Sequence, residues 1–188
     1  MWGHKQGQAG IYFIALTLLK LKSYIRFKKM NDKPNYKRMM SLIDEVFETR
    51  NDDNQIQVNK QELKKLTLIH PLTLTEVANE DGPVIWLLVI PTTAEMMYDF
   101  LSSKISEKQL LALTPLHTKY NVLYLCSVTT LPEYSGKGKT YELCINTINA
   151  IAKEHPIEFL LVWPFTKAGE ALAIKIANAS GLKLLTKK

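Results

Sequence analysis

Residues 132–140 read Pro132-Glu133-Tyr134-Ser135-Gly136-Lys137-Gly138-Lys139-Thr140. They stand between an almost wholly apolar run, Val122 to Val128, and an amphipathic helical pattern, Tyr141 to Ala152. In such a strand–turn–helix unit the free amides of the first helical turn and the positive end of the helix dipole both face the turn. A phosphate or pyrophosphate group is therefore the expected occupant of this turn.

The rest of the chain alternates helical and extended patterns around that unit. Periodicity and capping signals predict helices over 36–47, 59–69, 140–153 and 166–179, short helices opened by Thr92 and Ser106 within 92–113, and strands over 84–90, 122–128, 157–163 and 182–185. The second half reads strand–helix–strand–helix–strand, which is typical of parallel strands joined by helical crossovers. The sequence thus predicts an α/β fold, with residues 36–188 as a single domain.

The net charge of +6 is concentrated at the N-terminus. Residues 1–40 contain nine Lys or Arg and one acidic residue, whereas residues 41–188 contain fifteen basic and seventeen acidic residues. Residues 1–35 are therefore interpreted as a basic arm or an extra helix. The apolar block Ile11 to Leu19 is too short to cross a bilayer, which takes about 20 residues. Contact of the arm with a membrane surface or a partner stays open, and no nucleic-acid partner is expected.

The cysteines and histidines bear on compartment and metal binding. Cys126 lies in an apolar strand and Cys144 on the apolar face of the following helix, so both are expected to be reduced core residues. This favours a cytoplasmic location. The four histidines are scattered along the chain, and no metal site is expected.

A nucleoside-triphosphate loop is one interpretation of the glycine turn. Gly138-Lys139-Thr140 matches the end of the motif G-x-x-x-x-G-K-[ST], but Glu133 stands where its first glycine should be. A carboxylate there would face the phosphates and lack the backbone freedom of glycine. The triphosphate interpretation is therefore rejected.

The turn is more similar to the GNAT superfamily of N-acetyltransferases. The signature of that family is an apolar strand, a Pro-Glu-Tyr-like turn, and then [QR]-x-x-G-x-[GA] at the start of a helix. Pro132-Glu133-Tyr134 and Gly136-Lys137-Gly138 stand in that register. The resemblance extends over about residues 120–186 and more weakly to 84–90. It implies a GNAT-like mixed sheet flanked by helices, with a β-α-β core in the C-terminal half that binds CoA.

The resemblance also implies acetyl-CoA as co-substrate and an amine, on a small molecule or a peptide, as acceptor. A bulge in the strand would open the slot for CoA. The family pattern places the pantetheine arm against Val128, Thr129 and Thr130. It places the pyrophosphate on Ser135, Gly136, Lys137, Gly138, Lys139 and Thr140. A homodimer stays open, and the sequence names neither the acceptor nor the acyl group.

Three positions depart from the family pattern. Ser135 replaces a long polar or cationic residue, and Thr140 replaces a small one. Ala177 stands where many members carry the tyrosine that protonates the departing thiolate, so no catalytic residue is assigned. Glu133 and Tyr134 are expected to serve the turn. The alternative function is therefore a degenerate GNAT-like module that binds CoA or a partner without catalysis.

Overall fold

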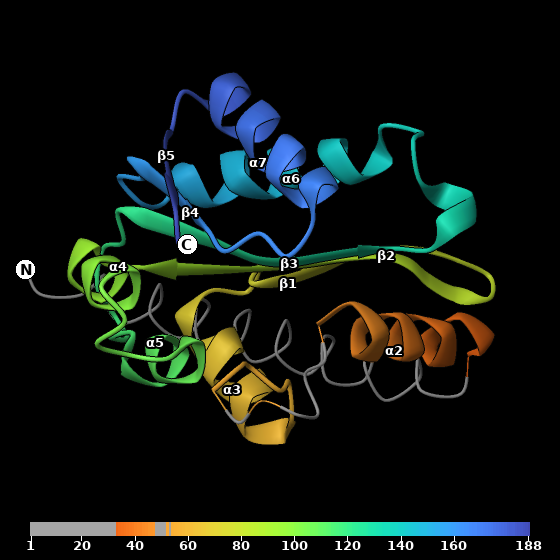
Figure 1. Cartoon of the computed structure of the whole chain (residues 1–188), viewed down its shortest axis with the longest axis horizontal. Coiled ribbons are helices and arrows are strands. Elements are labelled where there is room, and N and C mark those ends of the chain that lie inside the picture. The colour runs from red at the N-terminus through yellow and green to blue at the C-terminus, as the bar shows by residue number, and fades with distance from the viewer. Residues whose placement is uncertain (1–32, 48–51, 53) are drawn as a thin grey trace, which may run out of the picture.

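The computed structural model describes residues 33–47, 52 and 54–188 (Figure 1). These residues form six α-helices, five strands and one short 3-10 helix. The helices are α2 (Pro34–Phe47), α3 (Lys60–Ile69), α4 (Ala94–Leu101), α5 (Glu107–Leu113), α6 (Lys139–Ala152) and α7 (Lys167–Ser180). The strands are β1 (Leu74–Asn79), β2 (Gly82–Thr92), β3 (Val122–Thr130), β4 (Phe159–Val162) and β5 (Lys183–Thr186), and the 3-10 helix is η2 (Pro132–Tyr134).

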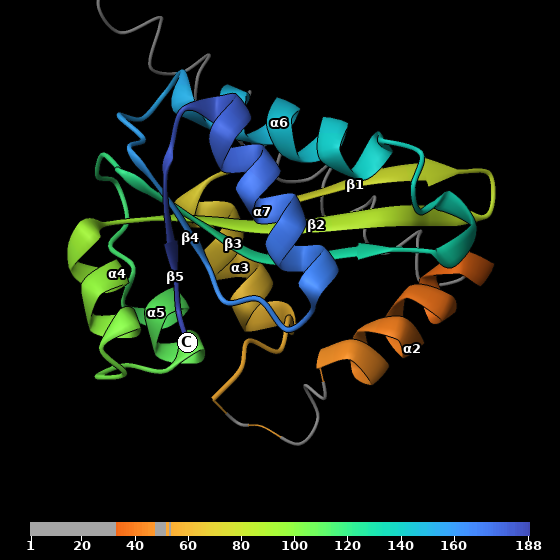
Figure 2. The ribbon, with the colours of Figure 1, turned by 45° about the horizontal axis from the view of Figure 1, so that its top comes forward.

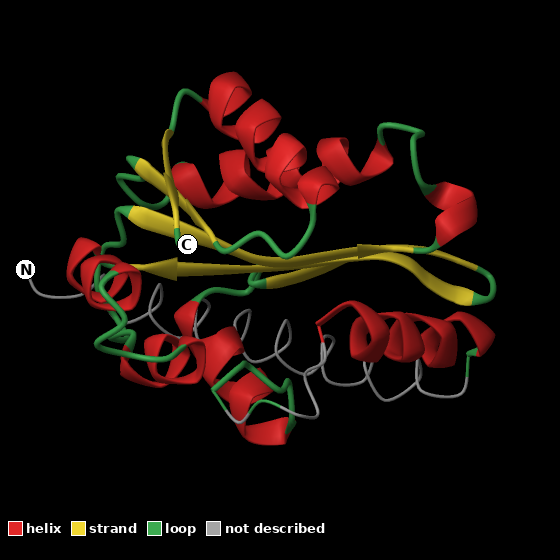
Figure 3. Ribbon diagram, in the orientation of Figure 1, coloured by secondary structure: helices red, strands yellow, loops and turns green. Residues whose placement is uncertain are grey.

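All five strands form one mixed sheet in the order β1-β2-β3-β4-β5 (Figure 3). The pairs β1–β2 and β2–β3 are antiparallel, and the pairs β3–β4 and β4–β5 are parallel. The helices α6 and α7 form the two connections between parallel strands, as the alternating pattern predicted. The predicted α/β class, with a mixed sheet between helices, is confirmed.

Helices cover both faces of the sheet (Figures 1 and 2). Helices α6 and α7 pack on one face through Cys144, Ile148 and Ile176, against inward-facing residues such as Leu123. Helices α3, α4 and α5 pack on the other face around Tyr124. The side chains of β2 alternate between the two cores, as the period of a strand buried on both faces requires.

Helix α2 covers the far end of the α3–α5 face (Figure 2). Its buried residue Met39 packs against Val84, Ile85 and Trp86 at the start of β2, and against Leu131 just after β3. The helix therefore rests beside the segment that leads into the glycine turn.

Several local predictions are confirmed by cap geometry. Asn59 caps α3 by accepting from the amides of Gln61 and Glu62, and Ser106 forms a full capping box with Gln109. Thr166 caps α7, and Gly181 ends it in the left-handed conformation.

One prediction of local structure was wrong, and one strand was not predicted. The residue that caps α4 is Thr93, whereas the Thr92 hydroxyl is buried at the end of β2 and pairs with the hydroxyl of Thr114 at 2.8 Å. The edge strand β1 was not predicted. Its residues are half-buried or exposed, so its hydrophobic signal is weak.

Residues 1–32 of the predicted basic arm, with the apolar block Ile11 to Leu19, lie outside the described residues. The description begins at Lys33, and α2 begins at Pro34. Within the described residues, the helices fall short of the length and apolar character needed to cross a membrane.

Candidate functional site

Strand β3 carries a bulge in front of the glycine turn. Leu88 of β2 pairs with Ser127 and the next residue, Val89, pairs with Leu125, so Cys126 is the extra residue. The parallel pairing of β3 with β4 ends at the same level, with Leu125 opposite Val162. Because β3 runs on to Thr130, residues 126–130 extend beyond the end of β4. A bulge bends a strand and ends its regular pairing, and β3 shows both effects at Cys126.

The glycine turn is open and exposed. Gly136 and Gly138 have φ values of 71° and 75°, and a Cβ on either would meet no atom within 4 Å. Gly138 is the N-cap of α6, and among the described residues no side-chain cap hydrogen bond is present at this helix start. Left-handed residues next to a helix start turn successive amides toward one side, which makes an anion-binding concavity. The turn therefore has two left-handed glycines at the start of α6, as a turn that binds an anion requires.

The residues predicted to contact the pantetheine arm, 128–130, lie on the segment of β3 beyond the bulge. Thr129 is buried and Val128 packs partly against the α6–α7 core. The Thr130 and Thr140 hydroxyls are 2.9 Å apart, so they join the end of β3 to the first turn of α6. The structure thus brings the two predicted groups, 128–130 and 135–140, together at one place.

The two lysines of the turn have partners of their own. The Lys139 ammonium lies 3.1 Å from Glu142 in the first turn of α6. The Lys137 ammonium lies 5.4 Å from the centre of the Tyr134 ring. Both side chains are exposed, so either can turn toward an anion at small cost.

Glu133 and Tyr134 hold the turn to neighbouring elements. Arg38 of α2 donates two hydrogen bonds to the Glu133 carboxylate, at 2.7 and 3.0 Å. Asn79 at the end of β1 donates to the Tyr134 hydroxyl at 2.9 Å. Both side chains therefore make structural contacts, as the sequence analysis expected.

The Arg38–Glu133 pair predicts a small, pH-dependent effect on stability. The hydrogen bonds from Arg38 hold the pKa of Glu133 below its usual range. The stabilisation is therefore present above the usual carboxyl pKa and is lost as the pH falls through the lowered value. We expect Arg38→Ala to lower the melting temperature slightly at pH 7, with the difference from wild type shrinking as the pH falls through the lowered pKa of Glu133. Lys37→Ala is the matched exposed control on α2, and a difference that stayed constant with pH would contradict this account.

A buried carboxylate that the sequence analysis missed lies beside the bulge. Glu107 of α5 is 7 % exposed. It accepts hydrogen bonds from the Tyr124 hydroxyl at 2.5 Å, from the Ile56 amide at 3.0 Å and from the Cys126 thiol at 3.4 Å. Burial raises the pKa of Tyr124 and of Cys126 well above their ordinary values, so both groups keep the protons that they donate. Glu107 therefore ties α5 and the loop before α3 to the strand at its bulge.

Two surface hollows lie outside the glycine turn, and neither is lined by any residue of 128–140. One lies at the start of α4, between Thr93, Lys119 and Glu158. The other lies between α4, α5 and the end of the sheet, where Glu107, Trp163 and Lys187 are among its lining residues. Its position beyond the end of β4 places it near the bulge of β3, on the α5 face.

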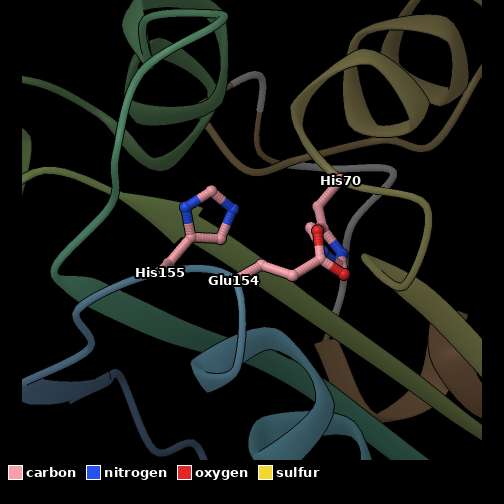
Figure 4. A group of neighbouring side chains, drawn as sticks. All are labelled: His70, Glu154 and His155. Carbon is pink, nitrogen blue, oxygen red and sulfur yellow. The ribbon is translucent and has the colours of Figure 1, made fainter. Parts of the chain in front are cut away.

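A cluster of ionisable side chains forms at the opposite end of the sheet from the glycine turn. His70, at the end of α3, lies beside Glu154 and His155, which follow α6 (Figure 4). The four histidines are scattered in the sequence, and nothing in their spacing shows that these two loops meet. The only available signal was that His70 and His155 each precede a proline, which marks both as ends of elements.

Comparison of the chain with protein-family models, with curated proteins and with solved structures finds no match. Function must therefore follow from the chain's own geometry. Its most distinctive feature is the bulged strand β3, which extends beyond the end of its parallel neighbour β4 and is followed by the glycine turn at the start of α6.

Proposed function

We propose that the chain is an acetyl-CoA-dependent N-acetyltransferase of the GNAT type. The observation that carries the proposal is the bulge at Cys126, where β3 loses its pairing with β4 just before the glycine turn. A strand edge that is free beyond its neighbour can pair with the amide groups of a pantetheine arm. The uncapped amides of α6 lie at the end of that edge and suit a pyrophosphate.

The other expectations from the family resemblance form part of this proposal. Acetyl-CoA is the co-substrate, and the acceptor is an amine on a small molecule or a peptide. A cytoplasmic location is supported by the two free cysteines, Cys126 and Cys144. Burial raises the pKa of Cys144 to about 12, which suits a core residue and excludes a role as nucleophile.

A second candidate is a module that binds CoA or a partner without catalysis. It is favoured by Ala177, a buried residue of α7 that stands at the position where the family resemblance calls for a tyrosine. Glu133 and Tyr134 are both engaged in structural contacts and do not replace that tyrosine. An active enzyme would rely on positioning the two reactants and on a base that acts through water.

Thermal melting with acetyl-CoA tests the shared binding step. At about 100 times its dissociation constant, a ligand stabilises the folded state by about 2.7 kcal/mol. For a chain of this length that corresponds to a rise of roughly 5–10 °C in melting temperature. We expect acetyl-CoA and CoA to produce the rise and ATP with Mg²⁺ to produce none.

Four further outcomes separate the candidates. Release of free CoA thiol with any member of a panel of primary amines supports the enzyme, whereas binding without release supports the non-catalytic module. No stabilisation by millimolar acetyl-CoA or CoA would contradict both CoA proposals. Stabilisation by ATP with Mg²⁺ alone would restore the triphosphate interpretation.

A further inference from the structure

Three potential metal ligands converge from two loops that are far apart in the sequence. One ligand atom each of His70, Glu154 and His155 lies within 4.8 Å of the other two. Figure 4 shows the Glu154 side chain reaching from the end of α6 toward the ring of His70, with His155 beside it. The cluster is distinct from the glycine turn and shares no residue with it.

Backbone hydrogen bonds hold both loops in place. The His70 amide donates to Leu66 O at 3.0 Å, and the His70 carbonyl accepts from the Thr73 amide at 3.2 Å. The Glu154 and His155 amides both donate to Ile151 O, at 3.0 and 3.1 Å. The three side chains therefore project from backbone that is held by hydrogen bonds.

The Nε2 atom of His70 is buried without a hydrogen bond to any residue that the structure describes. The residue is 3 % exposed, and its Nε2 atom lies 3.5 Å from a carboxylate oxygen of Glu154. A buried polar atom without a partner is rare in folded proteins, and such an atom commonly binds an ion or an ordered water molecule. Here the atom faces the Glu154 carboxylate, and the ring of His155 lies 5.7 Å away, centroid to centroid.

The set of donors suits zinc. Two imidazoles and one carboxylate are a known ligand set for Zn²⁺, with water in the fourth position. Burial lowers the pKa of His70 and of His155, which favours the neutral form that binds metals. Lys119 also contacts the cluster from a neighbouring segment, but its ammonium is occupied by the backbone carbonyl of Glu154 at 2.7 Å.

The site must contract to hold the ion. Ligands bound to one zinc at about 2.1 Å lie roughly 3.4 Å apart in tetrahedral geometry. The Glu154 side chain is 64 % exposed and can move to close this distance. His155 is half-buried between the rings of His70 and Tyr120, at centroid distances of 5.7 and 4.8 Å, so its own movement is limited.

We propose that His70, Glu154 and His155 form a zinc site that joins the end of α3 to the end of α6. The tautomer of His70 must change when the ion binds. The Leu72 amide donates to His70 Nδ1 at 3.1 Å, so the neutral ring carries its proton on Nε2 in the metal-free protein. Coordination through Nε2 moves this proton to Nδ1 and breaks the bond from Leu72. The Leu72 amide is thus a reporter of occupancy.

Metal titration of the full chain, produced without a polyhistidine tag, tests the site. We expect one Zn²⁺ per chain by calorimetry, and Co²⁺ in its place to give the visible absorption of a tetrahedral ion. Glu154→Gln and His155→Ala should each weaken binding at least tenfold. The NMR signal of the Leu72 amide should shift on saturation with zinc.

The other two histidines of the chain, His4 and His117, supply controls. His4→Gln and His117→Asn should bind as wild type does; asparagine suits His117 because its φ is 58°. Glu154→Gln alters an exposed side chain, so loss of the fold cannot explain its effect. Absence of saturable binding to the wild type, or wild-type affinity in both Glu154→Gln and His155→Ala, would overturn the site. Neither result bears on acetyl-CoA binding.

Discussion

Glu107→Ala should lower the free energy of unfolding by about 2–4 kcal/mol, because it leaves buried donors without an acceptor. The Glu107 carboxylate accepts from the Tyr124 hydroxyl, the Ile56 amide and the Cys126 thiol. The substitution also removes a carboxylate that is costly to bury. The expected loss in the free energy of unfolding is therefore smaller than the summed contributions of the three hydrogen bonds. Urea denaturation measures the change, and the slope with denaturant shows whether unfolding stays two-state.

Two further variants, Lys108→Ala and Tyr124→Phe, test whether the loss of stability comes from the hydrogen bonds of Glu107. Lys108→Ala changes the exposed neighbour on α5 and should alter stability by less than about 0.5 kcal/mol. Tyr124→Phe removes one donor and leaves the carboxylate with two, so it should cost about 1 kcal/mol. The double variant Glu107→Ala/Tyr124→Phe should lose less stability than the two single variants do together. In it the Tyr124 hydroxyl is absent, so it no longer needs an acceptor. A Glu107→Ala protein as stable as Lys108→Ala would show that water satisfies these donors.

Gly138→Val should abolish the stabilisation by acetyl-CoA and so remove the whole expected rise of roughly 5–10 °C. Gly138 has φ of 75° at the N-cap of α6, and a β-branched residue strongly resists this conformation. Because a Cβ here meets no atom within 4 Å, the effect arises from the backbone and not from a clash. The valine pulls the turn out of shape and redirects the amides that face the phosphates.

Gly181→Val is a closely matched control. Gly181 also has positive φ, of 68°, lies exposed at a helix end, and leaves a Cβ free of neighbours within 4 Å. Both variants should lose about 1–2 kcal/mol of stability from strain in the left-handed region. The response to acetyl-CoA should persist in Gly181→Val alone. Equal responses in the two variants would show that the glycine turn is not the binding site.

The sequence predicted the parts of the fold that local chemistry determines. The run Val122 to Val128, the glycine turn and the amphipathic helix after it appear as β3, the turn and α6. Caps at Asn59, Ser106 and Thr166 were visible because a cap depends on residues three positions apart.

Features that depend on contacts between distant segments could not be predicted. The bulge at Cys126 follows from the register between β2 and β3, which no local pattern shows. Glu107 looks like an ordinary first-turn helix residue until α5 packs against Tyr124. Likewise, 84 positions of sequence separate His70 from Glu154, and only the folded chain places their side chains together.

The order of the strands in the sheet has a consequence for how the molecule can assemble. In the part of the chain that the structure describes, each strand pairs only with the strands before and after it. No strand has to be inserted between two that are already paired. The sheet can therefore form by adding one strand at a time to a single edge, from β1 to β5, in the order in which the strands are synthesised. The β1–β2 hairpin, closed by the short turn at Glu80 and Asp81, has the smallest loop-closure entropy of the four pairings and is the natural place for this growth to begin.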